Sequence, residues 1–345
     1  KEEAVTMRDA APFAVLDRAQ AEAWVRALSE RFKLYPAIHT ASVALRSNNV
    51  VIRYVNSEGT TFYRVLPVVS FEAKAGTQAP DGMPLQDFES AYGRAMADLP
   101  DLKALEKRID ALGARVTALS QASIGTAYNG PVLFEGQAAA ELMGQVFARN
   151  LSGTRAVGGR RRGRGGAGGG RNPFLDRIGA RVMPAFLSVV DDPLAARHQK
   201  VGLVGGAKVD EDGVPKRKTV LVERGYLKTL LTTRTPVSGI SKSTGSRRGN
   251  GPVPSNLFVI SKKTQDAKKL RKTFLKLVKD RGKDYGIVVR RIGNPSFQAL
   301  RNVGGRGRRQ SSVFGVVMAY KVYRDGREEL IRNAVLSGLD ASTFK

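Results

Sequence analysis

The sequence predicts an α+β protein of mixed two-domain architecture, in which an N-terminal antiparallel sheet with helices precedes a C-terminal β-rich domain with one or two packed helices. Three observations support this prediction. The 345 residues suffice for about two domains of the usual size. Apolar runs typical of strands alternate with a few segments of helical periodicity. The charge also divides, because residues 1–130 are neutral and residues 131–345 carry the whole net charge of +26.

The N-terminal domain is expected over residues 1–125. Residues 11–35 have apolar positions at spacings of three and four, which predicts a helix that Pro36 ends. Residues 101–120 have the same spacing with one narrow apolar seam, so this second helix packs either within its own domain or against a partner helix. The β-rich runs between the helices predict an antiparallel meander, with a turn at 56–59 before the last run. These runs are 41–45, 50–55 and 61–69.

The C-terminal domain is expected over residues 126–345. It opens with a short strand at 132–134 and a helix at 138–147. Residues 158–171 are all Gly, Arg or Ala and have no large apolar side chain to bury, so they predict a mobile loop. Residues 234–254 are rich in Ser, Thr, Gly and Pro and predict a second long loop.

The rest of the C-terminal domain is expected to be β-rich around one further helix. Turn signals at 210–213 and 223–225 predict two successive hairpins, with strands at 201–209, 218–222 and 226–232. A helix at 264–281, ended by Gly282, is expected to turn its apolar residues inward and its lysines outward. The inward residues are Ala267, Leu270, Phe274, Leu277 and Val278. The last strands are expected at 286–291, 313–323 and 329–333.

The composition restricts the available chemistry. The absence of Cys excludes disulfides, thiolate metal ligands and cysteine nucleophiles. The two histidines, His39 and His198, have no spacing to each other or to carboxylates that indicates a metal site, so we expect both to be structural. No apolar run reaches the length of a membrane-spanning helix. A cytoplasmic location is favoured, while a periplasmic or secreted location stays open because we expect an N-terminal segment to be missing.

The net charge of +26 and the pI near 10.6 suggest a polyanionic partner. The charge is concentrated at 155–171, 262–283 and 301–309. The candidate contacts are Arg160, Arg161, Arg162 and Arg164 in the first patch and Lys268, Lys269, Lys272, Lys276 and Lys279 in the second. Such a surface fits nonspecific contacts with phosphates of nucleic acid or of an anionic membrane. The alternative is an ordinary solvated surface, since no aromatic residues interleave with the Arg/Gly segment.

Several segments occur in a characteristic order along the chain. They are 54–60, 130–142, 186–193, 210–219, 223–228, 254–257 and 323–329. In this order they resemble the TldD/PmbA family, also called modulator of DNA gyrase, of metallopeptidase-related proteins. The resemblance covers about residues 50–340, and no single segment would carry it. The family is usually longer at the N-terminus, so the chain is expected to be truncated or processed at its start.

The resemblance implies a specific chemistry from which this chain departs. Active members of the family carry a His-Glu-x-x-x-His helix that holds zinc, with a Cys as third ligand. The best match here has Ala140 and Gln145 at the histidine positions and retains only Glu141, and the chain has no Cys. The resemblance is therefore to the PmbA-like branch that lacks the zinc motif, whose members pair with a zinc-bearing TldD-like subunit. Without a metal, we expect Glu141 to be a solvated residue or a partner contact rather than a general base.

Further candidate positions are Ser255 and Asn256, which follow the long loop. Such loops border clefts in enzymes, so this pair is a candidate for contacts with the substrate backbone. The alternative is that both residues form loop-capping hydrogen bonds. We expect the acidic clusters at 191–192 and 210–212 to form turns rather than cation sites.

The sequence thus predicts a catalytically incomplete subunit, a pseudoenzyme, of a TldD/PmbA-type metallopeptidase system that acts on peptides or unfolded protein segments. We expect no cofactor in this chain, with zinc in a TldD-like partner of a heterodimer, or else a homodimer. The alternative function is binding of nucleic acid or another polyanion on the same scaffold. A peptidase with an unrecognised nucleophile has the least support.

Overall fold

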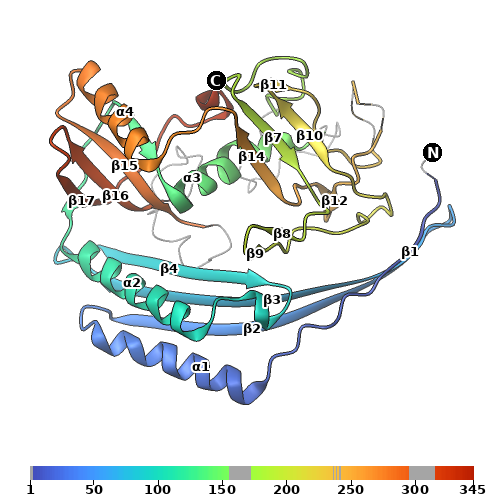
Figure 1. Cartoon of the computed structure of the whole chain (residues 1–345), viewed down its shortest axis with the longest axis horizontal. Coiled ribbons are helices and arrows are strands. Elements are labelled where there is room, and N and C mark those ends of the chain that lie inside the picture. Colours follow the sequence, from blue (N-terminus) through green and yellow to red (C-terminus); the bar gives the residue numbers. More distant parts are fainter. Residues whose placement is uncertain (1–2, 155–171, 236, 238, 241, 295–314) are drawn as a thin grey trace.

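The computed structural model describes residues 3–154, 172–235, 237, 239–240, 242–294 and 315–345. It confirms the α+β class (Figure 1). A long N-terminal sheet with two helices on its outer face forms one side of the molecule, and the sheets of the C-terminal half lie against its other side.

The N-terminal sheet is the predicted antiparallel meander. It contains β2 (Thr40–Val55), β3 (Thr61–Gln78) and β4 (Pro84–Gly93). In the turn between β2 and β3, the side-chain oxygen of Asn56 accepts hydrogen bonds from the N–H groups of Glu58 (3.0 Å) and Thr60 (2.9 Å), and Gly59 has a φ of 89°. Two strands of the sheet were not predicted. They are β4 and β1 (Thr6–Asp9), and β1 pairs in parallel with the start of β3.

The helices α1 (Arg18–Glu30) and α2 (Leu102–Ser120) cover one face of this sheet (Figure 1). An aspartate caps each of them, since Asp17 accepts from the N–H of Gln20 and Asp101 from that of Ala104. The apolar seam of α2 is buried against the sheet, so this helix packs within its own half of the chain. The shared core includes Leu28, Phe71, Ala73, Leu105, Ile109, Leu112 and Val116.

The helix predicted at 11–35 is wrong at its start. Phe13 and Val15, which were expected to be helical apolar positions, are exposed, and α1 begins after them. The chain there is held extended along β2, because the Asn49 side chain accepts from the N–H of Ala14 (2.8 Å) and donates to its carbonyl (2.9 Å). The separation of residues 41–45 and 50–55 into two runs is also wrong. The polar residues 46–49 between them stay paired with β3 in continuous register, so both runs belong to β2.

The β16 sheet, in the C-terminal half, has the strand order β5-β17-β16-β15-β6. Its strands are β5 (Ser123–Ile124), β6 (Val132–Phe134), β15 (Tyr285–Ile292), β16 (Val316–Tyr323) and β17 (Glu328–Arg332). Helix α3 (Gly136–Leu142) packs on Ile287 and Val289, and helix α4 (Ala267–Asp280) packs on Val288. Successive side chains of β15 therefore point to opposite faces of the sheet, one covered by α3 and the other by α4. The expected strand at 132–134 and the last strands are confirmed.

The β7 sheet lies beside α3 and has the order β11-β10-β7-β14. Its strands are β7 (Leu187–Asp191), β10 (Thr219–Glu223), β11 (Tyr226–Leu227) and β14 (Leu257–Ser261). Its core includes Phe147, Phe174, Val189, Leu221 and Leu231. Two short hairpins accompany it, β8 (Arg197–His198) with β9 (Val201–Gly202) and β12 (Arg247–Arg248) with β13 (Gly251–Pro252).

Short helical turns connect these elements. They are 3-10 turns at Arg31–Leu34, Met96–Asp98, Ala148–Leu151 and Ala341–Phe344, and a π-helical turn at Met143–Phe147. The π turn and the 3-10 turn after it extend α3 toward the core of the β7 sheet.

The first hairpin predicted in the C-terminal half is wrong. The β9 strand pairs back with β8, and Val209 makes one isolated bridge with Pro215. The glycines between them have a packing role, because a Cβ on Gly205 would lie 2.1 Å from the carbonyl oxygen of Ser255. The second predicted hairpin, β10 with β11, is confirmed.

The prediction for α4 is partly confirmed. Phe274 and Val278 are buried as expected. Leu270 and Leu277 are 41% and 49% exposed, and Ala267 is exposed. The buried face of α4 is therefore narrower than the set of apolar side chains along the helix. The sheet reaches only the middle of that set.

The predicted domain boundary at residue 125 follows β5, which pairs in parallel with β17. The N-terminal half of the chain thus contributes the edge strand of the β16 sheet. The division into domains 1–125 and 126–345 stays a prediction.

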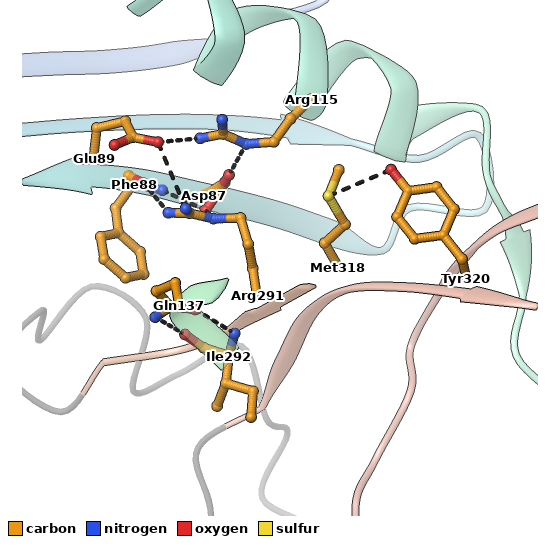
Figure 2. A network of polar contacts seen from close by, with 9 residues as sticks. All are labelled: Asp87, Phe88, Glu89, Arg115, Gln137, Arg291, Ile292, Met318 and Tyr320. Atoms are coloured by element: carbon orange, nitrogen blue, oxygen red, sulfur yellow. Dashed lines mark hydrogen bonds and ion pairs between the residues drawn. The ribbon is translucent and has the colours of Figure 1, made fainter. Parts of the chain in front are cut away.

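A buried carboxylate joins the two halves of the chain (Figure 2). Asp87 of β4 is fully buried and accepts from Nε of Arg115 in α2 (2.6 Å) and from Nε of Arg291 in β15 (2.7 Å). Glu89 adds a second acceptor for Arg115, at 2.7 Å. Arg291 also donates to the carbonyl oxygen of Phe88 and lies over its ring.

We expect Asp87→Asn to lower the free energy of unfolding by about 3–5 kcal/mol, because it removes the charge that balances two largely buried guanidinium groups. Urea denaturation measures this change. The control is Glu22→Gln, which removes an exposed ion pair with Arg18 and should cost no more than about 0.5 kcal/mol. Equal midpoints for both variants would show that the Asp87 network does not stabilise the fold.

Candidate functional site

The first candidate site is α3 with the π turn after it, where the zinc helix of the family is expected. In an α-helix, residues five positions apart lie on different faces, whereas a π turn brings them toward the same side. The π turn at Met143–Phe147 follows position 140 and includes position 145. The backbone therefore suits the spacing of the two histidines, although neither histidine is present.

Glu141 is held by side-chain amides. Its Oε2 accepts from Nε2 of Gln145 (2.8 Å), and its Oε1 accepts from Nδ2 of Asn294 (2.6 Å). The same Gln145 nitrogen donates to the carbonyl oxygen of Gly293 at 2.8 Å. The half-buried Glu141 thus fastens α3 to the segment that follows β15, instead of being solvated.

A zinc ion does not fit these residues. Ala140 offers no ligand atom, and the Gln145 amide nitrogen donates to Glu141 and to the Gly293 carbonyl oxygen and has no lone pair for a metal. Within the described ranges, no group of three or more His, Asp or Glu is arranged to hold a metal ion. The carboxylate of Glu141 therefore has an observed role in packing.

The second candidate site lies where β7 ends and β14 begins. Nζ of Lys216 donates to Oγ of Ser255 at 3.0 Å, and the N–H of Ser255 donates to Oδ1 of Asp191 at 2.7 Å. Lys216 and Asp191 are 7% and 2% exposed, whereas Ser255 is only half-buried. The structure thus places the hydroxyl of a partly buried serine within hydrogen-bond distance of a buried amine.

Burial changes the ionisation of this cluster. Burial and, to a lesser extent, the Arg248 guanidinium lower the pKa of Lys216 to about 8 against the opposing effects of Asp191 and Asp210. Burial also raises the pKa of Asp191. The pKa of Arg64 is lowered by burial too, and its Nε has no hydrogen-bond partner in the described part of the chain. The cluster therefore combines a hydroxyl with an amine that titrates near neutral pH.

Asn256, predicted together with Ser255, has a different environment. Its Nδ2 donates to the carbonyl oxygens of Asp192 (3.0 Å) and Ala195 (3.1 Å), and the residue is buried. These are the bonds of the loop-capping alternative. A substrate-cleft role for Ser255 and Asn256 stays a prediction.

The candidate polyanion contacts are only partly described. Arg160, Arg161, Arg162 and Arg164 lie outside the described residues, as does the 301–309 patch. The predicted α4 lysines are all exposed, and none forms an ion pair with the described residues. At about 100° per residue they fall within an arc of about 100° on the helix. These lysines are Lys268, Lys269, Lys272, Lys276 and Lys279.

Sequence reasoning missed Lys216, Asp191 and Arg64. Lys216 stands in the basic run 216–218, which is typical of a surface, and Asp191 was expected to form a turn with Asp192. The turn is made by Asp192, whose Oδ1 accepts from two N–H groups that follow it. Burial alone distinguishes the functional candidates, and no sequence signal marks it.

Comparison with known proteins identifies the family. Residues 127–299, about half of the chain, match the family described as the PmbA/TldA metallopeptidase C-terminal domain. The chain belongs to the TldD/PmbA family. A metalloprotease of Methanocaldococcus jannaschii is 35% identical over 79 residues, which are 23% of this chain and 16% of that protein. The match thus spans a small part of the length of this curated relative.

Solved structures show the same fold over the whole chain. A protein from Thermotoga maritima MSB8, described as a modulator of a DNA gyrase, has a TM-score of 0.69 at 17% identity and is matched over 100% of this chain and 73% of its own. A Bacteroides thetaiotaomicron VPI-5482 protein of the same description gives 0.62 at 11%, over 95% and 65%. TldE from Thermococcus kodakarensis gives 0.59 at 15%, over 100% and 73%. At these identities the likeness concerns the fold.

None of the helices in the described part of the chain combines the length and apolar character that a bilayer crossing requires.

We expect the purified chain to bind no stoichiometric zinc, because the α3 site offers one carboxylate that already accepts from two amides. Elemental analysis after dialysis against micromolar zinc measures the content. The double variant Ala140→His/Gln145→His supplies two imidazoles at the same place and should raise it. About one tightly held zinc per unmodified chain would contradict the expectation.

Proposed function

We propose that this chain is a catalytically incomplete, PmbA-like subunit that pairs with a zinc-bearing TldD-like subunit to hydrolyse peptides or unfolded protein segments. The observation that carries the proposal is the environment of Glu141. In a zinc peptidase this carboxylate takes a proton from metal-bound water. Here it accepts hydrogen bonds from Gln145 and Asn294 and serves packing.

The comparisons support the peptidase system and the partner. The curated relative is a metalloprotease, and TldE is among the proteins of the same fold. A chain that keeps the fold without the ligands needs a second subunit for zinc chemistry, which favours a heterodimer over a homodimer. In this proposal the partner subunit binds zinc, and both subunits contact the peptide.

The proposal predicts activity only in the mixture. The chain alone should show no chelator-sensitive cleavage of a fluorogenic unstructured peptide, whereas equimolar addition of a TldD-like subunit from the same genome should give cleavage that a chelator stops. Co-elution in size-exclusion chromatography should accompany the activity. Glu141→Gln should leave the mixture's kcat within about twofold, because the residue takes part in no proton transfer.

Two outcomes would contradict this proposal. One is chelator-sensitive cleavage by the chain alone at a rate similar to the mixture. The other is a TldD-like subunit whose activity and elution do not change when this chain is added.

A second candidate function is polyanion binding, which the lysine stripe on α4 favours. The five lysines point to solvent from one side of a helix whose other side is fixed on the β16 sheet by Phe274 and Val278. A rigid array of unpaired ammonium groups suits phosphates, which release condensed counterions when they are neutralised.

Binding of duplex DNA should then be independent of sequence and should weaken steeply with salt. Changing all five α4 lysines to Gln should make the slope of log K against log salt shallower by up to about 4. Fluorescence anisotropy at 50–200 mM salt measures the slope. Lys103→Gln/Lys107→Gln, on the exposed side of α2, is the control. Unchanged slopes in the α4 variant would exclude the stripe as the binding surface.

A further inference from the structure

Lys216 carries a buried amino group that forms no ion pair with the described residues. Burying an ammonium group without a counter-ion costs several kcal/mol in general, so buried lysines normally pair with a carboxylate. In the described part of the chain, no carboxylate lies within ion-pair distance of its Nζ, and the hydrogen bond it makes there is to Oγ of Ser255. A hydroxyl cannot balance a charge, so burial lowers the pKa of this amine.

We propose that Ser255 is a nucleophile for acyl transfer and that Lys216 is its general base, with carbonyl compounds of the ester or amide class as substrates. The two reacting atoms, Oγ and Nζ, are 3.0 Å apart, which is the distance of direct proton transfer. The hydroxyl is on the half-exposed residue and the amine is behind it. The residue that carries Oγ is thus more exposed than the one that carries Nζ.

The surrounding groups set the ionisation of the base. Arg248 from β12 and Arg64 from β3 disfavour the ammonium, while Asp191 from β7 and Asp210 favour it. Burial has the largest effect, and the pKa of Lys216 is about 8. About a tenth of the amine is thus neutral at pH 7 and about half at pH 8, and this fraction can accept a proton, unlike an exposed lysine with its pKa near 10.4.

Asp191 is a positioning residue in this arrangement. Its Oδ1 accepts from the N–H of Ser255 at 2.7 Å and so fixes the backbone that carries the nucleophile. The neighbouring Asn256 fastens the next residue to the 192–195 turn, and Gly205 lies against the Ser255 carbonyl. These contacts fix the backbone around Ser255, so they keep Oγ close to Nζ of Lys216 although none of them involves either atom.

The reaction proceeds in balanced steps. Oγ of Ser255 forms a bond to the carbonyl carbon as its proton passes to neutral Lys216. The bond to the leaving alkoxide or amine then breaks, and Lys216 gives it that proton. Water attacks the acyl-Ser255 ester, Lys216 takes a proton from the water, and the serine leaves with this proton. The products are a carboxylic acid and an alcohol or amine.

A fluorophosphonate tests the nucleophile directly, because an activated serine hydroxyl displaces fluoride from phosphorus and leaves a stable adduct. We expect the full chain, with chelator and without any partner subunit, to gain one adduct that peptide mapping places on Ser255. The rate should rise with pH through a midpoint near 8, since only neutral Lys216 is a base. Ser255→Ala should lose the adduct.

Lys216→Arg keeps the positive charge but cannot accept a proton, so labelling should slow by at least about 100-fold. The control is Ser261→Ala, which removes the serine at the end of β14, whose hydroxyl donates to the carbonyl oxygen of Lys263, and should not change labelling. The parent's pH profile decides the question even if the Lys216 variant fails to fold. The proposal is wrong if Ser255 of the parent is not labelled, or if its labelling is the same at pH 6 and pH 9.

This test is independent of the proposed subunit role. Labelling by the chain alone in the presence of chelator reports on Ser255 and Lys216, whereas chelator-sensitive cleavage in the mixture reports on the zinc-bearing partner.

Discussion

The arrangement of the two halves depends on one buried carboxylate. Asp87 of β4 receives a guanidinium from α2 and another from β15, so the N-terminal sheet, its helix and the β16 sheet meet at a single charge (Figure 2). A buried ion of this kind stabilises only when its partners are correctly placed, which makes it sensitive to position. Arg291 also precedes Ile292, whose N–H and carbonyl both bind Gln137 of α3. The location of α3 is thereby tied to the same charge.

Part of the strong basic character is used inside the molecule. Arg94 reaches from the N-terminal half to the carbonyl oxygens of Leu203 (3.2 Å) and Gly206 (2.9 Å), and Arg64 reaches to that of Val209. Arg332 acts in the opposite direction, since its Nε donates to the Ala122 carbonyl. Guanidinium groups suit such bonds to backbone carbonyl oxygens because one side chain offers several hydrogen-bond donors in a fixed plane. The net charge therefore overstates the cationic surface that a polyanion would meet.

The two candidate sites illustrate different uses of one scaffold. At α3 the backbone keeps a π turn of the kind found at functional sites, while its side chains have become a hydrogen-bonded fastening of helix to strand. At the end of β7, a hydroxyl, an amine and a carboxylate are brought together from distant parts of the chain, with burial shifting the ionisation of two of them. The first accounts for the proposed subunit role, and the second for the proposed nucleophile.

The sequence by itself determined the α+β class, the β2–β3 hairpin of the meander, α2, the second hairpin, the family and the loss of the zinc ligands, because periodicity, turn residues and ligand types are local properties. It could not determine the parallel strand β1, the strand pairing of residues 201–209 or the exposure of Leu270 and Leu277, since each depends on what packs nearby. Nor could it distinguish Lys216 from its basic neighbours. Only the tertiary structure buries that amine against Ser255, a residue 39 positions away, and burial is what changes its chemistry.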